Sequence, residues 1–179
     1  RAAWTRRDFV KVSGAGAAAA ALGAAGPSAM AGPRPMGGLR VGVIGCGGRG
    51  TGAAINVLEA SPDTEIVALA DVFADRLAGC RRELTSLGES PESRALAARV
   101  KVPEETCFVG FDAGERLIEQ GGCDVVILAT PPGFRPGHFA AAVAAGKHVF
   151  MEKPVAVDPA GVRVVLKAAA EAQARGLSV

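Results

Sequence analysis

Residues Leu39–Gly50 read LRVGVIGCGGRG, and the rest of the chain can be interpreted outward from this stretch. It begins with a short apolar run, which is typical of a strand buried on both faces of a parallel sheet. Gly45, Gly47 and Gly50 follow the spacing G-x-G-x-x-G, and Thr51–Ala60 has the pattern of a helix. In such a unit the first glycine permits a tight turn, the second lets backbone approach a pyrophosphate, and the third lets helix and strand pack closely. The stretch predicts a dinucleotide site.

A second predicted strand, Glu65–Ala70, is followed by Asp71, which lies 21 residues beyond Gly50. An acidic residue at about this distance binds the ribose in dinucleotide folds. Its carboxylate accepts hydrogen bonds from both ribose hydroxyls and repels a 2′-phosphate, and the next residues, Val72 and Phe73, carry no positive charge. We therefore expect NAD as the cofactor, with NADP disfavoured. The alternative is that Asp71 is only the N-cap of the next helix, although the two roles are compatible.

Composition excludes several other classes of protein. The chain has 179 residues, of which 49% are hydrophobic and 21% charged, and its net charge of +2 gives no reason to expect a nucleic-acid partner. The four cysteines show no C-x-x-C pair and no histidine at ligand spacing, so we expect neither a metal site nor a disulfide framework. The chain starts with Arg1 and stops where another strand would begin, so we expect it to be a fragment of a longer protein.

The first residues have the order of an export signal. TRRDFVK at Thr5–Lys11 precedes a weakly apolar stretch, Gly14–Gly26, and a small-x-small site that ends at Ala31. This segment resembles a twin-arginine signal peptide, and its apolar part is too short for a membrane span. We therefore expect export to the periplasm. The predicted organisation is a signal peptide over 1–31, a linker over 32–38 and a dinucleotide-binding domain over 39–179.

Strand and helix patterns alternate after the linker, while the polar stretch 88–102 is hard to interpret and is predicted to be partly helical. The alternation predicts an α/β fold, a doubly wound and mostly parallel sheet of the Rossmann type. Asp158 and Pro159 have the pattern of an N-cap and first helical residue. The expected strands are 39–44, 65–70, 106–109, 124–129 and 148–151, and the expected helices are 51–60, 74–87, 113–120, 136–145 and 159–175.

Two further motifs follow expected strands, at the sheet edge where ligands bind in such folds. Thr130-Pro131-Pro132 follows the fourth strand and forms either a stiff wall against the nucleotide or a simple turn. Glu152-Lys153-Pro154 follows the fifth. A lysine beside a nicotinamide can hydrogen-bond a substrate hydroxyl and act as a general acid or base, and a cis Lys153–Pro154 bond is compatible with the sequence. The alternative is a solvated surface pair.

The segments VGVIGCGGRG, ALAD, ATPP and GKHVFMEKPVAVD, in this order, resemble the Gfo/Idh/MocA family, named after glucose–fructose oxidoreductase and inositol dehydrogenase. The resemblance covers about residues 39–179, the nucleotide-binding domain of that family. It implies that Lys153 is the catalytic-site lysine and that Glu152 lies alongside the nicotinamide. The cofactor-binding residues that it implies are Gly45, Cys46, Gly47, Gly48, Arg49, Gly50, Asp71, Thr130, Pro131, Glu152 and Lys153.

The chain departs from this family in two respects. Members often read T-P-N-x-x-H, whereas Pro132 replaces the asparagine and Arg135 the histidine; His138 does not automatically inherit that role. The further catalytic residues of the family, typically a histidine with an aspartate or tyrosine, belong to a C-terminal α+β domain that this chain lacks. We therefore expect the fragment alone to be inactive.

These features predict the NAD-binding domain of an exported oxidoreductase that transfers hydride from CH–OH groups of sugar- or polyol-like substrates. One alternative is an NAD-dependent glycosidase that works by oxidation and elimination. Another is a non-catalytic nucleotide-binding protein in which Lys153 no longer takes part in a reaction. We expect a small carbohydrate or polyol as the partner, no nucleic acid, no stable membrane span, and a homo-oligomeric parent.

Overall fold

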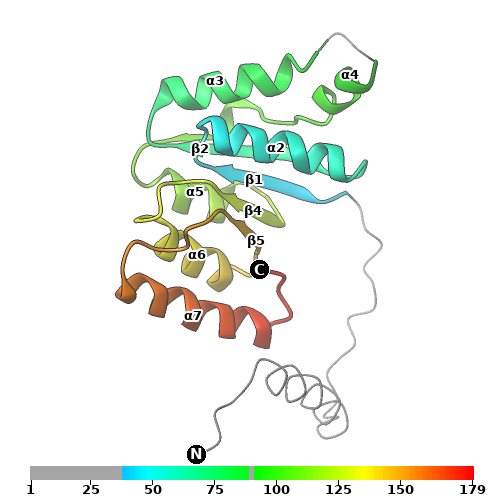
Figure 1. Cartoon of the computed structure of the whole chain (residues 1–179). Coiled ribbons are helices and arrows are strands. Elements are labelled where there is room, and N and C mark those ends of the chain that lie inside the picture. Colours follow the sequence, from blue (N-terminus) through cyan, green and yellow to red (C-terminus); the bar gives the residue numbers. More distant parts are fainter. Residues whose placement is uncertain (1–37, 89–90) are drawn as a thin grey trace, which may run out of the picture. The chain divides into compact units, whose positions relative to one another are not determined.

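The computed structural model describes residues 38–88 and 91–179, and the predicted signal peptide lies outside them. In this part of the chain, five strands form one sheet in the order β3-β2-β1-β4-β5, and every neighbouring pair is parallel. This arrangement confirms the predicted doubly wound α/β fold (Figure 1). The strands are β1 (Arg40–Ile44), β2 (Glu65–Asp71), β3 (Cys107–Val109), β4 (Val125–Leu128) and β5 (His148–Met151).

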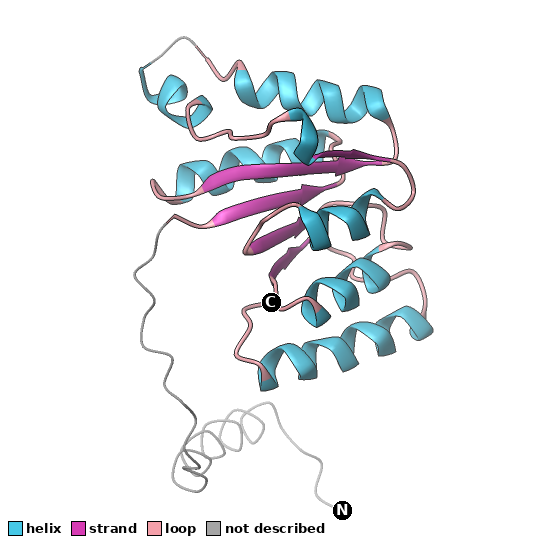
Figure 2. Ribbon diagram, turned by 180° about the vertical axis from the view of Figure 1, so that it is seen from behind, coloured by secondary structure: helices cyan, strands magenta, loops and turns pink. Residues whose placement is uncertain are grey.

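Helices cover both faces of the sheet (Figure 2). One apolar core joins α2 and α3 to β1 and β2, and the other joins α5, α6 and α7 to the opposite face. The central strand β1 shows why its residues after Arg40 are apolar: Val41 and Val43 belong to the first core and Ile44 to the second, and all three are buried. The helices are α2 (Gly48–Ala60), α3 (Ala74–Thr85), α4 (Pro91–Ala97), α5 (Ala113–Gln120), α6 (Arg135–Ala144) and α7 (Pro159–Ala174), and a short 3₁₀ turn, η2, spans Glu104–Thr106.

Most element boundaries lie within two residues of their predicted positions, but α2 begins three residues earlier than expected. Its N-cap is Gly47, and the amide of Thr51 makes the first helical hydrogen bond, to the Gly47 carbonyl. The predicted start of α7 is confirmed, because the Asp158 carboxylate accepts a hydrogen bond from the amide of Gly161 at 2.6 Å. The early start of α2 matters for the site, since the glycine motif itself supplies the open end of the helix.

Candidate functional site

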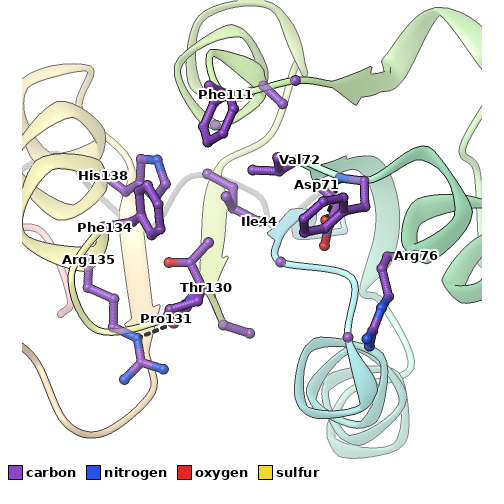
Figure 3. A pocket seen from close by; sticks show the side chains of 17 residues that line it. Ile44, Asp71, Val72, Arg76, Phe111, Thr130, Pro131, Phe134, Arg135 and His138 are labelled. Atoms are coloured by element: carbon purple, nitrogen blue, oxygen red, sulfur yellow. Dashed lines mark hydrogen bonds between the residues drawn. The ribbon is translucent and has the colours of Figure 1, made fainter.

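A cavity of about 550 Å³ opens at the carboxyl ends of β1, β2 and β4. Figure 3 shows Asp71 and Arg76 on one side of it and Phe134 and His138 on the other, with Thr130 between them. Open parallel sheets bind their ligands in such a crevice, at the carboxyl ends of their strands. The lining residues are Ile44, Gly45, Gly47, Asp71, Val72, Phe73, Arg76, Gly110, Phe111, Ala113, Gly114, Ala129, Thr130, Pro131, Phe134, Arg135 and His138.

Two glycines of the motif are required by the packing of the protein itself. Gly45 has a φ of 98°, and a Cβ there would lie 2.8 Å from the carbonyl carbon of Ala129. A Cβ at Gly50 would overlap the carbonyl of Gly45. These positions confirm the tight turn and the close helix–strand contact that the spacing predicts.

Gly47 and Gly48 differ from Gly45 and Gly50, because the packing of the protein does not require a glycine at either position. Gly47 has extended backbone angles, φ −74° and ψ 179°, that any residue can adopt. A Cβ at Gly47 would approach nothing nearer than the Arg76 guanidinium at 4.0 Å, and one at Gly48 would meet nothing within 4 Å. The open space beside Gly47 faces the cavity, and the first amides of α2 precede its first internal hydrogen bond. This is a cradle that a side chain would fill and that an anionic group fits.

Asp71 links the glycine turn to the end of β2. Its Oδ2 accepts a hydrogen bond from the amide of Cys46 at 2.7 Å, and its Oδ1 accepts one from the amide of Phe73 at 2.9 Å. Phe73 is the N-cap residue of α3, so the alternative that Asp71 caps this helix is wrong. Each carboxylate oxygen retains a second acceptor position, and the half-buried side chain lines the cavity.

Cys46 contributes to the site through its backbone. Its side chain is buried under the turn, and its amide is already donated to Asp71. The hydrogen bond with Cys80, together with burial, raises the pKa of the Cys46 thiol. The thiol is therefore neutral at physiological pH and is not a nucleophile or an anionic ligand.

Arg76 lines the cavity from the first turn of α3, and no motif in the sequence points to it. It lies five residues beyond Asp71, past Val72 and Phe73, the two uncharged residues on which the expectation of NAD rests. A helix that starts at Ala74 brings the third helical residue back toward the end of β2. The acidic side of the cavity thus also contains a cation.

The loop after β4 is held by an arginine. Arg135 is buried, and its Nε donates a hydrogen bond to the carbonyl of Thr130 at 2.7 Å. The same side chain binds the carbonyls of Glu152 and Pro154, both at 2.6 Å. Arg135 occupies the position where the resembling family often has histidine, and it acts here between the loops after β4 and β5. Thr130 and Pro131 line the cavity, and the buried Thr130 Oγ1 has no hydrogen-bond partner among the described residues.

Glu152 and Lys153 lie outside the lining of this cavity. The Glu152 carboxylate is buried and pairs with Arg49, whose Nε lies 2.8 Å from Oε1. Lys153 is exposed, and the Lys153–Pro154 bond is cis. The ion pair joins the glycine turn to the segment after β5, so two of the predicted site residues that are distant in sequence are in direct contact.

His138 forms the wall opposite Asp71. It is buried, its ring stacks on that of Phe134 with the centroids 6.3 Å apart, and its Nδ1 has no partner among the described residues. Burial lowers the pKa of His138, and Glu115, whose Oε1 lies 3.9 Å from Nε2, opposes this effect. The cavity therefore offers a neutral imidazole beside two aromatic side chains, Phe111 and Phe134.

Within 38–88 and 91–179, no group of three or more histidine, cysteine or acidic side chains is arranged to hold a metal ion. None of the helices in these described residues has the length and apolarity needed to cross a membrane.

The parallel sheet, the open glycine turn and the acidic residue at the end of the second strand define a dinucleotide-binding Rossmann domain. Residues 39–179 match the family described as "Oxidoreductase family, NAD-binding Rossmann fold", GFO_IDH_MocA. The chain therefore belongs to the Gfo/Idh/MocA oxidoreductase family and contains its NAD-binding domain.

Among curated proteins, the chain is 34% identical over 157 residues to a glycosyl hydrolase family 109 protein of Solibacter usitatus, covering 85% of this chain and 33% of that protein. It is 30% identical over 130 residues to an inositol 2-dehydrogenase of Agrobacterium fabrum, covering 73% and 33%. A solved scyllo-inositol dehydrogenase from Lactobacillus casei, with bound NAD(H) and scyllo-inositol, has the same fold, with a TM-score of 0.58, 24% identity and coverage of 78% and 34%. The chain spans about a third of the length of these proteins.

Proposed function

We propose that the full-length protein oxidises a CH–OH group of a sugar- or polyol-like substrate with NAD. The observation that carries this proposal is the open space beside Gly47, next to Asp71, on the same sheet edge as the segment that contains Lys153. The resemblance to an inositol 2-dehydrogenase supports the substrate class.

The residues of the site fit the cofactor from end to end. The space at Gly47 and the first amides of α2 suit the pyrophosphate, and Asp71 suits the adenosine ribose hydroxyls. Thr130 and Pro131 form the wall of the cavity toward the loop after β5. Glu152 and Lys153 follow β5. With the adenosine ribose at Asp71 and the pyrophosphate at Gly47, the nicotinamide end of the cofactor belongs on the side of β5.

When bound, NAD supplies the hydride acceptor, nicotinamide C4. The part of this chain is to move the proton: as the hydride leaves the substrate carbon, Lys153 in its unprotonated form accepts the hydroxyl proton, so an alcohol becomes a carbonyl and the lysine becomes an ammonium ion. Lys153 is exposed at the sheet edge, which leaves its amine free to reach a substrate. In the reverse direction the ammonium returns the proton.

The test is Lys153→Ala in the full-length protein, with Lys167→Ala, an exposed lysine on α7, as the matched control. We expect kcat to fall by about 10²–10⁴-fold. The Kd for NAD, measured by calorimetry, should change by less than about fivefold, because the pyrophosphate turn is untouched. Loss of NAD binding would make Lys153 a cofactor ligand, and an unchanged kcat would reject the catalytic assignment.

A glycosidase that uses NAD for oxidation and elimination is the second candidate, favoured by the 34% identity to a glycosyl hydrolase family 109 protein. The two candidates differ in their products. Net NADH formation with a free sugar or polyol supports the oxidoreductase. Cleavage of an aryl glycoside without net NADH supports the glycosidase.

We further propose that the protein is exported by the twin-arginine route and that its full-length form is a homo-oligomer. Arg6 and Arg7 precede a weakly apolar stretch and a small-x-small site in the sequence. Changing both arginines to lysine should retain the precursor in the cytoplasm, and an unchanged periplasmic yield would reject this route. Sedimentation analysis of the mature protein measures the oligomeric state.

A further inference from the structure

We propose that Arg135 is the positioning residue for Lys153: it holds the backbone carbonyls of the two residues that flank the lysine and ties them to the loop after β4. This inference deepens the proposed function and rests on it for the role of the lysine. The arginine belongs to the lining of the cavity but is buried, whereas Lys153 is exposed.

Three hydrogen bonds carry the proposal. One Nη atom of Arg135 donates to the carbonyls of Glu152 and Pro154, both at 2.6 Å, and these are the residues immediately before and after Lys153. The Nε atom donates to the carbonyl of Thr130 at 2.7 Å. The backbone around Lys153 is therefore fixed relative to a residue that lines the dinucleotide cavity.

The chemistry of the side chain explains why arginine is used here. A guanidinium has five N–H donors in a rigid planar fork and accepts no hydrogen bond, so one residue can bind several carbonyls that converge on it. A lysine ammonium is a compact group on a flexible stem and lacks that fork. Burial lowers the pKa of Arg135 and the charge of Glu152 opposes this, but a guanidinium remains charged in proteins. The contact is thus a permanent, directional one.

Arg99 provides an internal control for this interpretation. Its guanidinium also binds three carbonyls, those of Leu58, Ser61 and Thr64. These carbonyls lie around the end of α2 and the start of β2, at the opposite end of that strand from the cavity. Arg99→Lys therefore tests the loss of a similar structural contact without touching the segment of Lys153.

The experiment compares Arg135→Lys and Arg99→Lys in the full-length protein. We expect Arg135→Lys to lower kcat by roughly 10- to 100-fold, because a small displacement of a proton-transfer group is costly. The Kd for NAD should change by less than about threefold. Arg99→Lys should leave kcat unchanged, even if it lowers the melting temperature as much as Arg135→Lys does. An equal loss of kcat in both variants would reduce Arg135 to a structural role and overturn the proposal.

A double-mutant cycle tests whether Arg135 acts through the lysine. In a Lys153→Ala background, Arg135→Lys should lower kcat by less than about threefold, because the group that it positions is absent. Independent, additive losses would overturn the proposal. If Arg135→Lys does not fold, Arg135→Ala assayed with and without added guanidinium replaces it, with sodium chloride at equal ionic strength as the control; guanidinium should restore kcat, and no restoration counts against the proposal.

A third measurement does not need turnover. Amide hydrogen exchange of residues 151–157 should accelerate in Arg135→Lys and stay unchanged in Arg99→Lys. If the wild type neither oxidises polyols nor cleaves glycosides, the proposed function fails, yet exchange still shows whether Arg135 holds this segment. Unchanged exchange in Arg135→Lys would overturn the inference whatever the activity.

Discussion

The Nε atom of Arg49 lies 2.8 Å from Oε1 of Glu152, which joins the glycine turn after β1 to the segment after β5. The two residues are more than a hundred positions apart in sequence. Glu152 is 8% exposed at its side chain and Arg49 is 72% exposed, so the pair has a buried anionic half and a solvated cationic half. It connects the proposed pyrophosphate end of the site to the residue next to the proposed catalytic lysine.

This ion pair is expected to add little to stability. Because the arginine is largely in solvent, the coupling free energy between Arg49 and Glu152 should be below about 1 kcal/mol and should shrink further at high salt. Urea unfolding of Arg49→Ala, Glu152→Gln and the double variant measures it. A coupling of 2 kcal/mol or more, independent of salt, would show that the pair is effectively desolvated.

Gly47→Val and Gly50→Val should fail in different ways. The backbone angles of Gly47 suit any residue and its Cβ position is open, so the valine variant should fold and lose NAD binding, since its side chain would occupy the space for the pyrophosphate. A Cβ at Gly50 would overlap the Gly45 carbonyl, so that variant should lose stability, by about 1–3 kcal/mol or more. Thermal unfolding and NAD calorimetry on both variants test this. Retained NAD affinity in Gly47→Val would remove the glycine turn from the site.

The choice of cofactor should depend on Asp71 and Arg76 together. We expect the wild type to bind NAD at least about tenfold more tightly than NADP, because the carboxylate repels a 2′-phosphate. Asp71→Ser should bring the NAD and NADP dissociation constants closer together, since Arg76 remains in the cavity to pair with the 2′-phosphate. Adding Arg76→Ala should weaken NADP binding again. Equal affinities in the wild type would contradict the prediction, and so would a serine variant with an unchanged ratio.

His138 should make the protein less stable in mild acid. Burial lowers its pKa below the ordinary value of 6.5, so as pH falls through that value the unfolded chain takes up a proton that the folded protein resists. The free energy of unfolding should therefore decrease from about pH 7 to about pH 5, and His138→Gln should flatten this part of the curve. Glu115→Gln should steepen it, because Glu115 raises the pKa. Parallel curves for His138→Gln and the wild type would contradict the assignment.

Local signals account for what could be predicted. The turn at Gly45 and the cap at Asp158 each depend on the residues themselves and their near neighbours. The parallel sheet followed from alternating strand and helix patterns, because parallel strands need crossover helices. The predicted start of α2 is three residues late, at Thr51 and not Gly48, because glycine has a low helix propensity. The helix nevertheless begins within the glycine motif, with Gly47 as its N-cap.

By itself, the sequence determined the dinucleotide-binding fold and the edge of the sheet at which its site lies. Only the tertiary structure decided which side chains meet there. Arg76 lies near Gly47, Arg49 pairs with Glu152, and Arg135 holds the carbonyls on both sides of Lys153. The physical reason is that strand order β3-β2-β1-β4-β5 is a product of long-range packing. Contacts between loops that follow different strands exist only once that order is formed, and spacing along the chain carries no record of them.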